Sequence, residues 1–238
     1  MSIWTRIIEA LSALASGEGL SIVFDRLRAA PSPEKSVGFT IAILALAAKM
    51  AKADGKVTRD EVSTFRAIFT IPKADESNAA RVFDLARQDV AGFDSYARKV
   101  AALFNPAAQT LCADDHNILI DILEALFAIA MADGAYHPRE DVFLAKVAQI
   151  FGLDDRCFGA VRARYVDGAP RDPFAVLGAP PHASLAQLRA AWRAAVKANH
   201  PDGMIARGVP PEAVQLAARR LIAINEAWRE VQAMYVAP

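Results

Sequence analysis

The strongest constraint on the fold is the spacing of the apolar residues between positions 37 and 166, which recur every three or four residues. This period is typical of helices with a buried face, and no stretch in the range convincingly alternates apolar and polar residues as a half-buried strand does. With 54% apolar residues, the chain can bury enough surface to offset the entropy of ordering, which excludes a mainly disordered protein. The pattern predicts an all-α bundle with helices over residues 38–53, 59–70, 76–91, 94–104, 114–132, 138–151 and 155–165.

Two proline-containing segments, residues 31–36 and 167–173, interrupt this pattern and indicate linkers. The predicted organisation is an N-terminal helix and linker over 1–36, a helical domain over 37–166, a linker at 167–171 and a C-terminal module over 172–238. The chain has 27 Lys+Arg and 27 Asp+Glu, which argues against non-specific coating of nucleic acid. Residues 170–238 nevertheless hold eight basic and five acidic residues, so the C-terminal module is basic.

Neither apolar segment near the N-terminus is long enough to predict a membrane span, which needs about 20 residues. Residues 38–48 form an uncharged run of 11 residues and are expected to be a buried core helix. In residues 1–17, Arg6 and Glu9 interrupt apolar residues at helical spacing. This segment fits an amphipathic helix that either docks on its own domain or lies on a membrane or a partner.

The two cysteines, Cys112 and Cys157, are far apart and have no neighbours at metal-ligand spacing. This usage indicates neither a disulfide framework nor a structural zinc module, so a reducing compartment is expected.

A short motif occurs twice in the helical domain, at residues 50–61 and 129–140. In both copies an apolar helix ends at Ala-Asp-Gly and a Glu follows seven residues after the Asp. The four carboxylates of Asp54, Glu61, Asp133 and Glu140 could converge on a divalent cation, or each could cap a helix beside a left-handed glycine. Both interpretations stay open, and no metal site or cofactor is predicted. The pattern resembles the tellurite-resistance TerB-like helical domain over roughly residues 37–166, which implies a protein-interaction or metal-sensing module.

The C-terminal module begins with a short helix, since Asp172 and Pro173 are residue types that start helices and Gly178 can end one. Ser184 is the expected cap of a second helix over about 184–198. On this helix Arg189, Arg193 and Lys197 recur every four residues, so they form one basic stripe beside the apolar face.

His200-Pro201-Asp202 follows this basic helix directly. Because Pro201 disfavours helical geometry at His200, the helix is expected to stop and the tripeptide to enter a loop. A long helix then begins near Glu212, with apolar positions spaced alternately three and four residues apart, as in a helix packed antiparallel on a neighbour. Trp192 and Trp228 are the expected anchors of this hairpin.

Together these features resemble a J domain of the DnaJ family of Hsp co-chaperones. The match includes Asp-Pro-Phe-x-Val-Leu-Gly at 172–178, Leu-Arg-x-x-Trp-Arg-x-x-x-Lys at 188–197, His-Pro-Asp at 200–202 and Ile-Asn-Glu-Ala-Trp at 224–228. His-Pro-Asp alone is a weak signal, and its position between a basic helix and a heptad-patterned helix makes it specific. Asn199 and Gly203 depart from the family, which usually has an aromatic and a basic residue there, and these changes would weaken or retune partner affinity.

The resemblance implies a co-chaperone that docks on a DnaK-type ATPase and stimulates ATP hydrolysis there, so that this chain is not itself an enzyme. Arg189, Arg193 and Lys197 would steer the encounter with an acidic groove. Asp202 would accept a charge-assisted hydrogen bond from a cation of the partner, His200 would lie at the contact, and Pro201 would hold the turn. These six residues are the predicted partner-binding site.

The order of a TerB-like region and a C-terminal J domain resembles the DjlA family of bacterial co-chaperones. Members of that family are typically anchored in the inner membrane by an N-terminal transmembrane segment. Here only the charged stretch at residues 1–17 stands in that place, so a cytoplasmic protein is expected, with association with the inner membrane left open. The TerB-like region is the expected source of client or location specificity, while the client's identity and homodimerisation stay open.

Other function classes fit less well. A helix–turn–helix DNA binder needs a connector of about 3–4 residues, and the segment from 199 to 211 is much longer, so no nucleic-acid partner is predicted. A metal-dependent hydrolase built on the repeated carboxylates would want histidine ligands, and His137 alone is near. The remaining alternative is a metal-binding or stress-sensing adaptor of the tellurite-resistance type.

Overall fold

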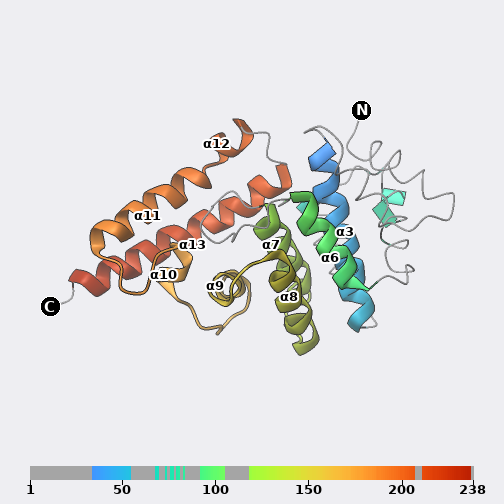
Figure 1. Ribbon diagram of the computed structural model, residues 1–238, viewed down its shortest axis with the longest axis horizontal. Coiled ribbons are helices and arrows are strands. Elements are labelled where there is room, and N and C mark those ends of the chain that lie inside the picture. Colours follow the sequence, from blue (N-terminus) through green and yellow to red (C-terminus); the bar gives the residue numbers. More distant parts are fainter. Residues whose placement is uncertain are drawn as a thin grey trace. The chain divides into compact units, whose positions relative to one another are not determined.

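The computed structural model describes residues 34–54, 92–104, 118–206 and 211–236, together with a few positions between 68 and 83 (Figure 1). The main elements of this part of the chain are all helices, and no strand occurs in it. They are α3 (Glu34–Asp54), α6 (Phe93–Phe104), α7 (Ile118–Ala130), α8 (Pro138–Phe151), α9 (Asp155–Tyr165), α10 (Pro173–Val176), α11 (Leu185–Ala198), α12 (Pro201–Ala206) and α13 (Pro211–Val236). The all-α prediction is confirmed. The expected helices at 1–17, 59–70 and 76–91 fall largely or wholly outside the described residues.

The chain divides into two compact units, which are described separately here. The first contains residues 1–109 and 125–151, and the second contains residues 110–124 and 152–238. This division groups α9 with the C-terminal helices, whereas the sequence pattern places residues 155–165 in the preceding helical domain. The predicted domain boundaries, in the sense of parts that fold independently, stay a prediction.

In the first unit, α3 contacts both α6 and α8. Residues 38–51 of α3 are all buried, so this helix is covered on every side and residues 38–48 are the core helix that their length predicts. Lys49 is buried within this range, and its ammonium group lies 4.9 Å from the centre of the Tyr96 ring, where the electron-rich face of the ring stabilises the charge. None of the described helices is both long and apolar enough to cross a membrane.

In the second unit, α11 and α13 pack antiparallel as a hairpin (Figure 1). The rings of Trp192 and Trp228 stack with their centres 5.2 Å apart, and the Trp192 indole N–H donates to Asn225 Oδ1 at 3.0 Å. Buried apolar residues surround the pair, among them Leu188, Ala195, Ile224, Ala227 and Val231. The prediction that the two tryptophans anchor the hairpin is confirmed.

Local capping explains where the helices of the second unit begin. Ser184 and Gln187 form a reciprocal capping box at the start of α11, and the Asp172 side chain accepts from the Phe174 N–H at the start of α10. Each cap satisfies a backbone donor that has no partner within the helix. The observed α10 and α11 therefore begin where the sequence predicts.

Cys157, in the first turn of α9, is disulfide-bonded, and its partner lies outside the described residues. The cysteine spacing does not predict this bond. With two cysteines the chain can form one such bond internally, which is not a framework of several disulfides.

Glu212 lies in the first turn of α13, where burial raises the pKa of its carboxyl group. Its Oε2 is buried without a hydrogen-bond partner among the described residues. The folded state therefore binds a proton that the unfolded state releases at about pH 4.3, so this carboxyl group costs stability as the pH rises above that value. We expect Glu212→Gln to raise the free energy of unfolding at pH 7 and to change it little at pH 3.5. Urea denaturation at both pH values checks this, and an equal effect at both would contradict it.

Candidate functional site

The predicted basic stripe lies on the solvent face of α11. Arg189, Arg193 and Lys197 are all exposed, while Leu188 and Ala195 on the opposite face are buried in the hairpin core. Within the described part of the chain, no carboxylate lies within ion-pair distance of these three cations, so their charges are available to an external partner.

The backbone around His200-Pro201-Asp202 differs from the expected loop. α11 ends at Ala198 with Asn199 as its C-cap, and a new helix, α12, begins at Pro201. Proline is favoured in the first helical turn because its fixed φ suits a helix and its missing N–H needs no partner there. Pro201 therefore ends one helix and starts another, and the prediction that the whole tripeptide lies in a loop is wrong.

His200 and Asp202 face solvent together at this break between the helices. Their side chains are 54% and 89% exposed, and His200 Nδ1 lies 3.8 Å from Asp202 Oδ2. His200 Nδ1 also accepts the Asp202 backbone N–H at 3.3 Å, which in the neutral imidazole leaves Nε2–H as a donor to solvent. The turn thus presents a carboxylate acceptor beside an imidazole donor.

The short helix α12 has one buried residue, Met204. The Met204 N–H donates to the His200 carbonyl at 3.1 Å, and α12 contacts both α11 and α13. Because both flanks of His200 are packed against the hairpin, the exposed pair has a fixed support.

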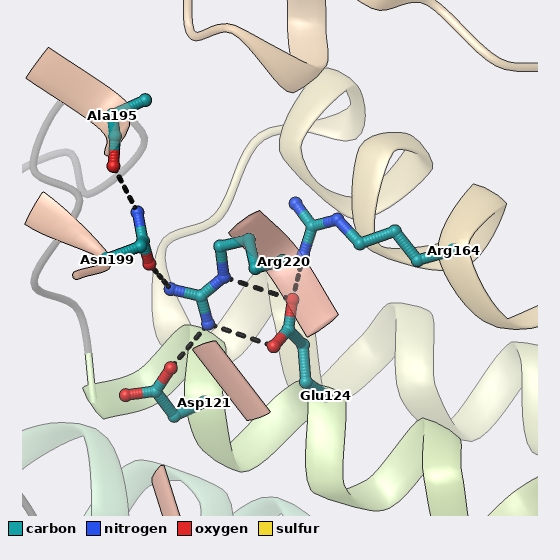
Figure 2. Close-up of polar contacts among 6 residues, drawn as sticks. All are labelled: Asp121, Glu124, Arg164, Ala195, Asn199 and Arg220. Atoms are coloured by element: carbon teal, nitrogen blue, oxygen red, sulfur yellow. Dashed lines mark hydrogen bonds and ion pairs between the residues drawn. The ribbon is translucent and has the colours of Figure 1, made fainter. Parts of the chain in front are cut away.

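A buried group of charged and polar side chains includes Asn199, the residue directly before this turn (Figure 2). We call it the Arg220 network, and it consists of Asp121, Glu124, Arg164, Asn199 and Arg220, all in the second unit. Arg220 Nε and Nη2 donate to the two Glu124 carboxylate oxygens at 3.1 and 2.9 Å, and Nη2 also donates to Asp121. Arg220 Nη1 donates to Asn199 Oδ1 at 3.0 Å, and Arg164 donates to Glu124. The side chains of Arg220, Asp121 and Glu124 are only 7%, 4% and 1% exposed.

The charges in this network are balanced, with two guanidinium groups against two carboxylates. Burial and the positive charge of Arg220 lower the pKa of Arg164 to about 9, which still leaves Arg164 protonated at neutral pH. The bidentate geometry between Arg220 and Glu124 suits a planar guanidinium and a carboxylate, and a lysine in that place could not reproduce it.

Sequence reasoning missed this network, although it left signals. Asp121 and Glu124 interrupt the otherwise apolar sequence of α7, and buried carboxylates require partners. Arg220 directly precedes an apolar seam position of α13, and Asn199 stands where the resembled family has an aromatic residue. None of these signals says which residue pairs with which, because the partners are 96 and 99 residues apart in the chain.

In the copy of the repeated acidic motif that the structure describes, both acids accept local backbone N–H groups, Asp133 within the turn after α7 and Glu140 at the start of α8. Asp133 Oδ1 accepts the Ala135 N–H at 2.9 Å, Gly134 has a φ of +80°, and Glu140 Oε2 accepts the His137 N–H at 3.0 Å just before α8. In the first copy, Asp54 is the last residue of α3 and Glu61 lies outside the described residues. No group of three or more candidate metal ligands occurs in the described part of the chain. The capping interpretation holds for the second copy.

Comparison with known proteins shows the family of the central part of the chain. Residues 40–163 match the family described as tellurite resistance protein TerB, over half of the chain, and the chain therefore belongs to the TerB family.

The chain is also similar, along most of its length, to proteins named co-chaperone protein DjlA. The relative from Photobacterium profundum is 26% identical over 87% of this chain and 78% of its own length. The relative from Coxiella burnetii is 26% identical over 77% and 72%, and that from Escherichia coli is 21% identical over 98% of both chains. No solved structure matches the chain significantly. The predicted TerB-like and DjlA-like resemblances are confirmed.

The Arg220 network makes a prediction about stability. We expect Arg220→Met to lower the free energy of unfolding by about 3–5 kcal/mol, because it removes a buried guanidinium that pairs with both Asp121 and Glu124. Arg219→Met is the matched control. Arg219 is the neighbouring arginine and is exposed, so its substitution should change stability by less than about 0.5 kcal/mol.

Urea denaturation followed by tryptophan fluorescence measures both values. The double variant Asp121→Asn/Arg220→Met should recover part of the lost stability, because it also removes the buried negative charge of Asp121. Equal effects of the Arg219 and Arg220 substitutions would contradict a buried ion network.

Proposed function

We propose that this protein is a J-domain co-chaperone that stimulates ATP hydrolysis by a DnaK-type Hsp ATPase. The observation that carries the proposal is the pairing of exposed His200 and Asp202 at a supported turn, directly after an exposed basic stripe. The similarity to relatives named co-chaperones over most of the chain supports the same assignment.

Recognition of the partner would occur in two stages. The uncompensated charges of Arg189, Arg193 and Lys197 would attract an acidic surface of the ATPase and raise the rate of productive encounter. Asp202, the most exposed member of the turn, would then accept a charge-assisted hydrogen bond from an arginine of the partner. His200 Nε2 would donate at the same contact, and Pro201 would fix the spacing of the two side chains.

In this mechanism the chain carries out no bond-making step of its own and needs no cofactor. ATP is bound and hydrolysed by the partner, and the binding energy of the turn is used to favour the partner's hydrolytically active conformation. The TerB domain would select the client or the location, since the C-terminal hairpin is occupied by the ATPase. A metal-sensing role receives no support from the Asp133 and Glu140 carboxylates, which accept local backbone N–H groups.

We place this activity in the cytoplasm, because the ATPase partner requires ATP. The described helices include no membrane-crossing candidate, and residues 1–17, outside the described part, are the segment to test for membrane association.

The first experiment measures single-turnover ATP hydrolysis by the host's DnaK-type ATPase with and without the full chain. We expect the wild-type protein to accelerate hydrolysis, and His200→Gln and Asp202→Asn to abolish the acceleration, because each removes one polar contact of the turn. Arg193→Gln should raise the half-saturating concentration several-fold at low salt and less at high salt, since screening weakens steering.

Arg229→Gln is the matched control, because Arg229 is an exposed arginine on α13 outside the stripe. It should behave as the wild type does. Equal stimulation by the wild type and by both turn variants would refute the mechanism, provided that circular dichroism shows unchanged helix content.

The cytoplasmic placement makes a separate prediction about Cys157. Disulfide bonds are rare in a reducing cytoplasm, so Cys157 should be a free thiol in the cell although the structure has it bonded. Rapid alkylation in acid-quenched cells, followed by mass spectrometry, measures this. A Cys157 that reacts only after reduction would contradict the placement.

A further inference from the structure

Asn199 joins the exposed turn to the interior of the protein. It is fully buried, although it directly precedes the exposed His200. Its Nδ2 donates to the Ala195 carbonyl at 2.9 Å, and its Oδ1 accepts from Arg220 Nη1 at 3.0 Å. The amide plane is thus held at both ends, on one side by α11 and on the other by α13.

Arg220 is held in turn by α7. Its guanidinium donates through Nε and Nη2 to Glu124 and through Nη2 to Asp121, so every nitrogen of the planar group has a partner (Figure 2). A rotation of this group would break several buried hydrogen bonds at once, which is costly in a low-dielectric interior. The carboxylates, the guanidinium and the Asn199 amide therefore form a stiff chain from α7 to the residue before His200.

We propose that Asp121 and Glu124 act, through Arg220 and Asn199, as positioning residues for the His200–Asp202 turn. The segment of α7 that supplies them belongs to the TerB family match, so the TerB domain sequence itself contributes to the partner-binding geometry. The inference rests on the proposed function for what the turn binds, while the coupling between α7 and the turn is independent of it.

The network supports the turn and does not cover it. His200 and Asp202 are 54% and 89% exposed while the network is fully formed beneath them, and the basic stripe is exposed as well. A contact that inhibited binding would be expected to bury these groups. Loss of the network should therefore weaken partner binding, because the turn would spend less time in the competent geometry.

The test uses the full chain and two kinds of variant. Asn199→Ala removes both hydrogen bonds of the amide but leaves the ion pairs intact, and Asp121→Asn/Glu124→Gln removes the charges with little change of shape. Glu226→Gln is the matched control. Glu226 lies on the same helix as Arg220, and it makes an exposed ion pair with Arg171. Helix content and the fluorescence of the stacked Trp192 and Trp228 report whether each variant folds.

The first measurement is amide hydrogen exchange, which needs no partner. We expect exchange over residues 199–206 to accelerate at least about tenfold in both kinds of variant, while the middle of α11 and α13 keeps its protection. Unchanged exchange over 199–206 would overturn the inference. Equal acceleration throughout the second unit would also overturn it, because it would show a purely structural role.

The second measurement is ATPase stimulation as a function of co-chaperone concentration. We expect Asn199→Ala to raise the half-saturating concentration at least about fivefold with the same maximum, whereas His200→Gln abolishes the stimulation at every concentration. An unchanged half-saturating concentration despite faster local exchange would overturn the positioning role. A wild-type protein that stimulates nothing would refute the proposed function, and hydrogen exchange alone would then decide the coupling.

Discussion

The buried guanidinium of Arg220 is the interaction on which the second unit depends, because it joins three parts of the chain at once. It neutralises carboxylates of α7, anchors the end of α11 through Asn199, and is itself carried by α13. An apolar contact in this place would tolerate sliding, whereas a planar donor with fixed acceptors does not. Buried ion networks of this kind often add more to the uniqueness of a structure than to its stability. Here the network ends at Asn199, the residue directly before the exposed turn.

Much of the fold could be predicted from the sequence, because helix starts and buried helix faces depend on residues that are close together in the chain. α8 and α9 begin and end at the predicted residues; in the structure Pro138 lies in the first turn of α8 and Asp154 caps α9. The long α13 and the tryptophan pair follow from a heptad-like seam in the same way. These features depend on neighbours three or four residues apart, which a reading of the sequence can see directly.

The candidate site was predicted in its exposed part and missed in its buried part. The basic stripe recurs every four residues on one helix, so its place on the surface follows from helix geometry. His200 and Asp202 directly follow the end of that helix. Pro201 disfavours a helix at the residue before it and also suits the start of α12, and local sequence does not separate these two roles. The Arg220 network joins residues nearly 100 positions apart, and no periodicity connects them.

The dependence of Arg220 on α7 has a consequence for transplanting parts of this protein. A C-terminal segment cut at the linker near residue 170 leaves behind Asp121 and Glu124, the two acids that pair with its buried Arg220. A chimera that joins residues 172–238 to a foreign helical domain would carry a buried cation with no counter-charge. Such a chimera should be designed either with a host helix bearing acids at the spacing of Asp121 and Glu124, or with an apolar residue in place of Arg220.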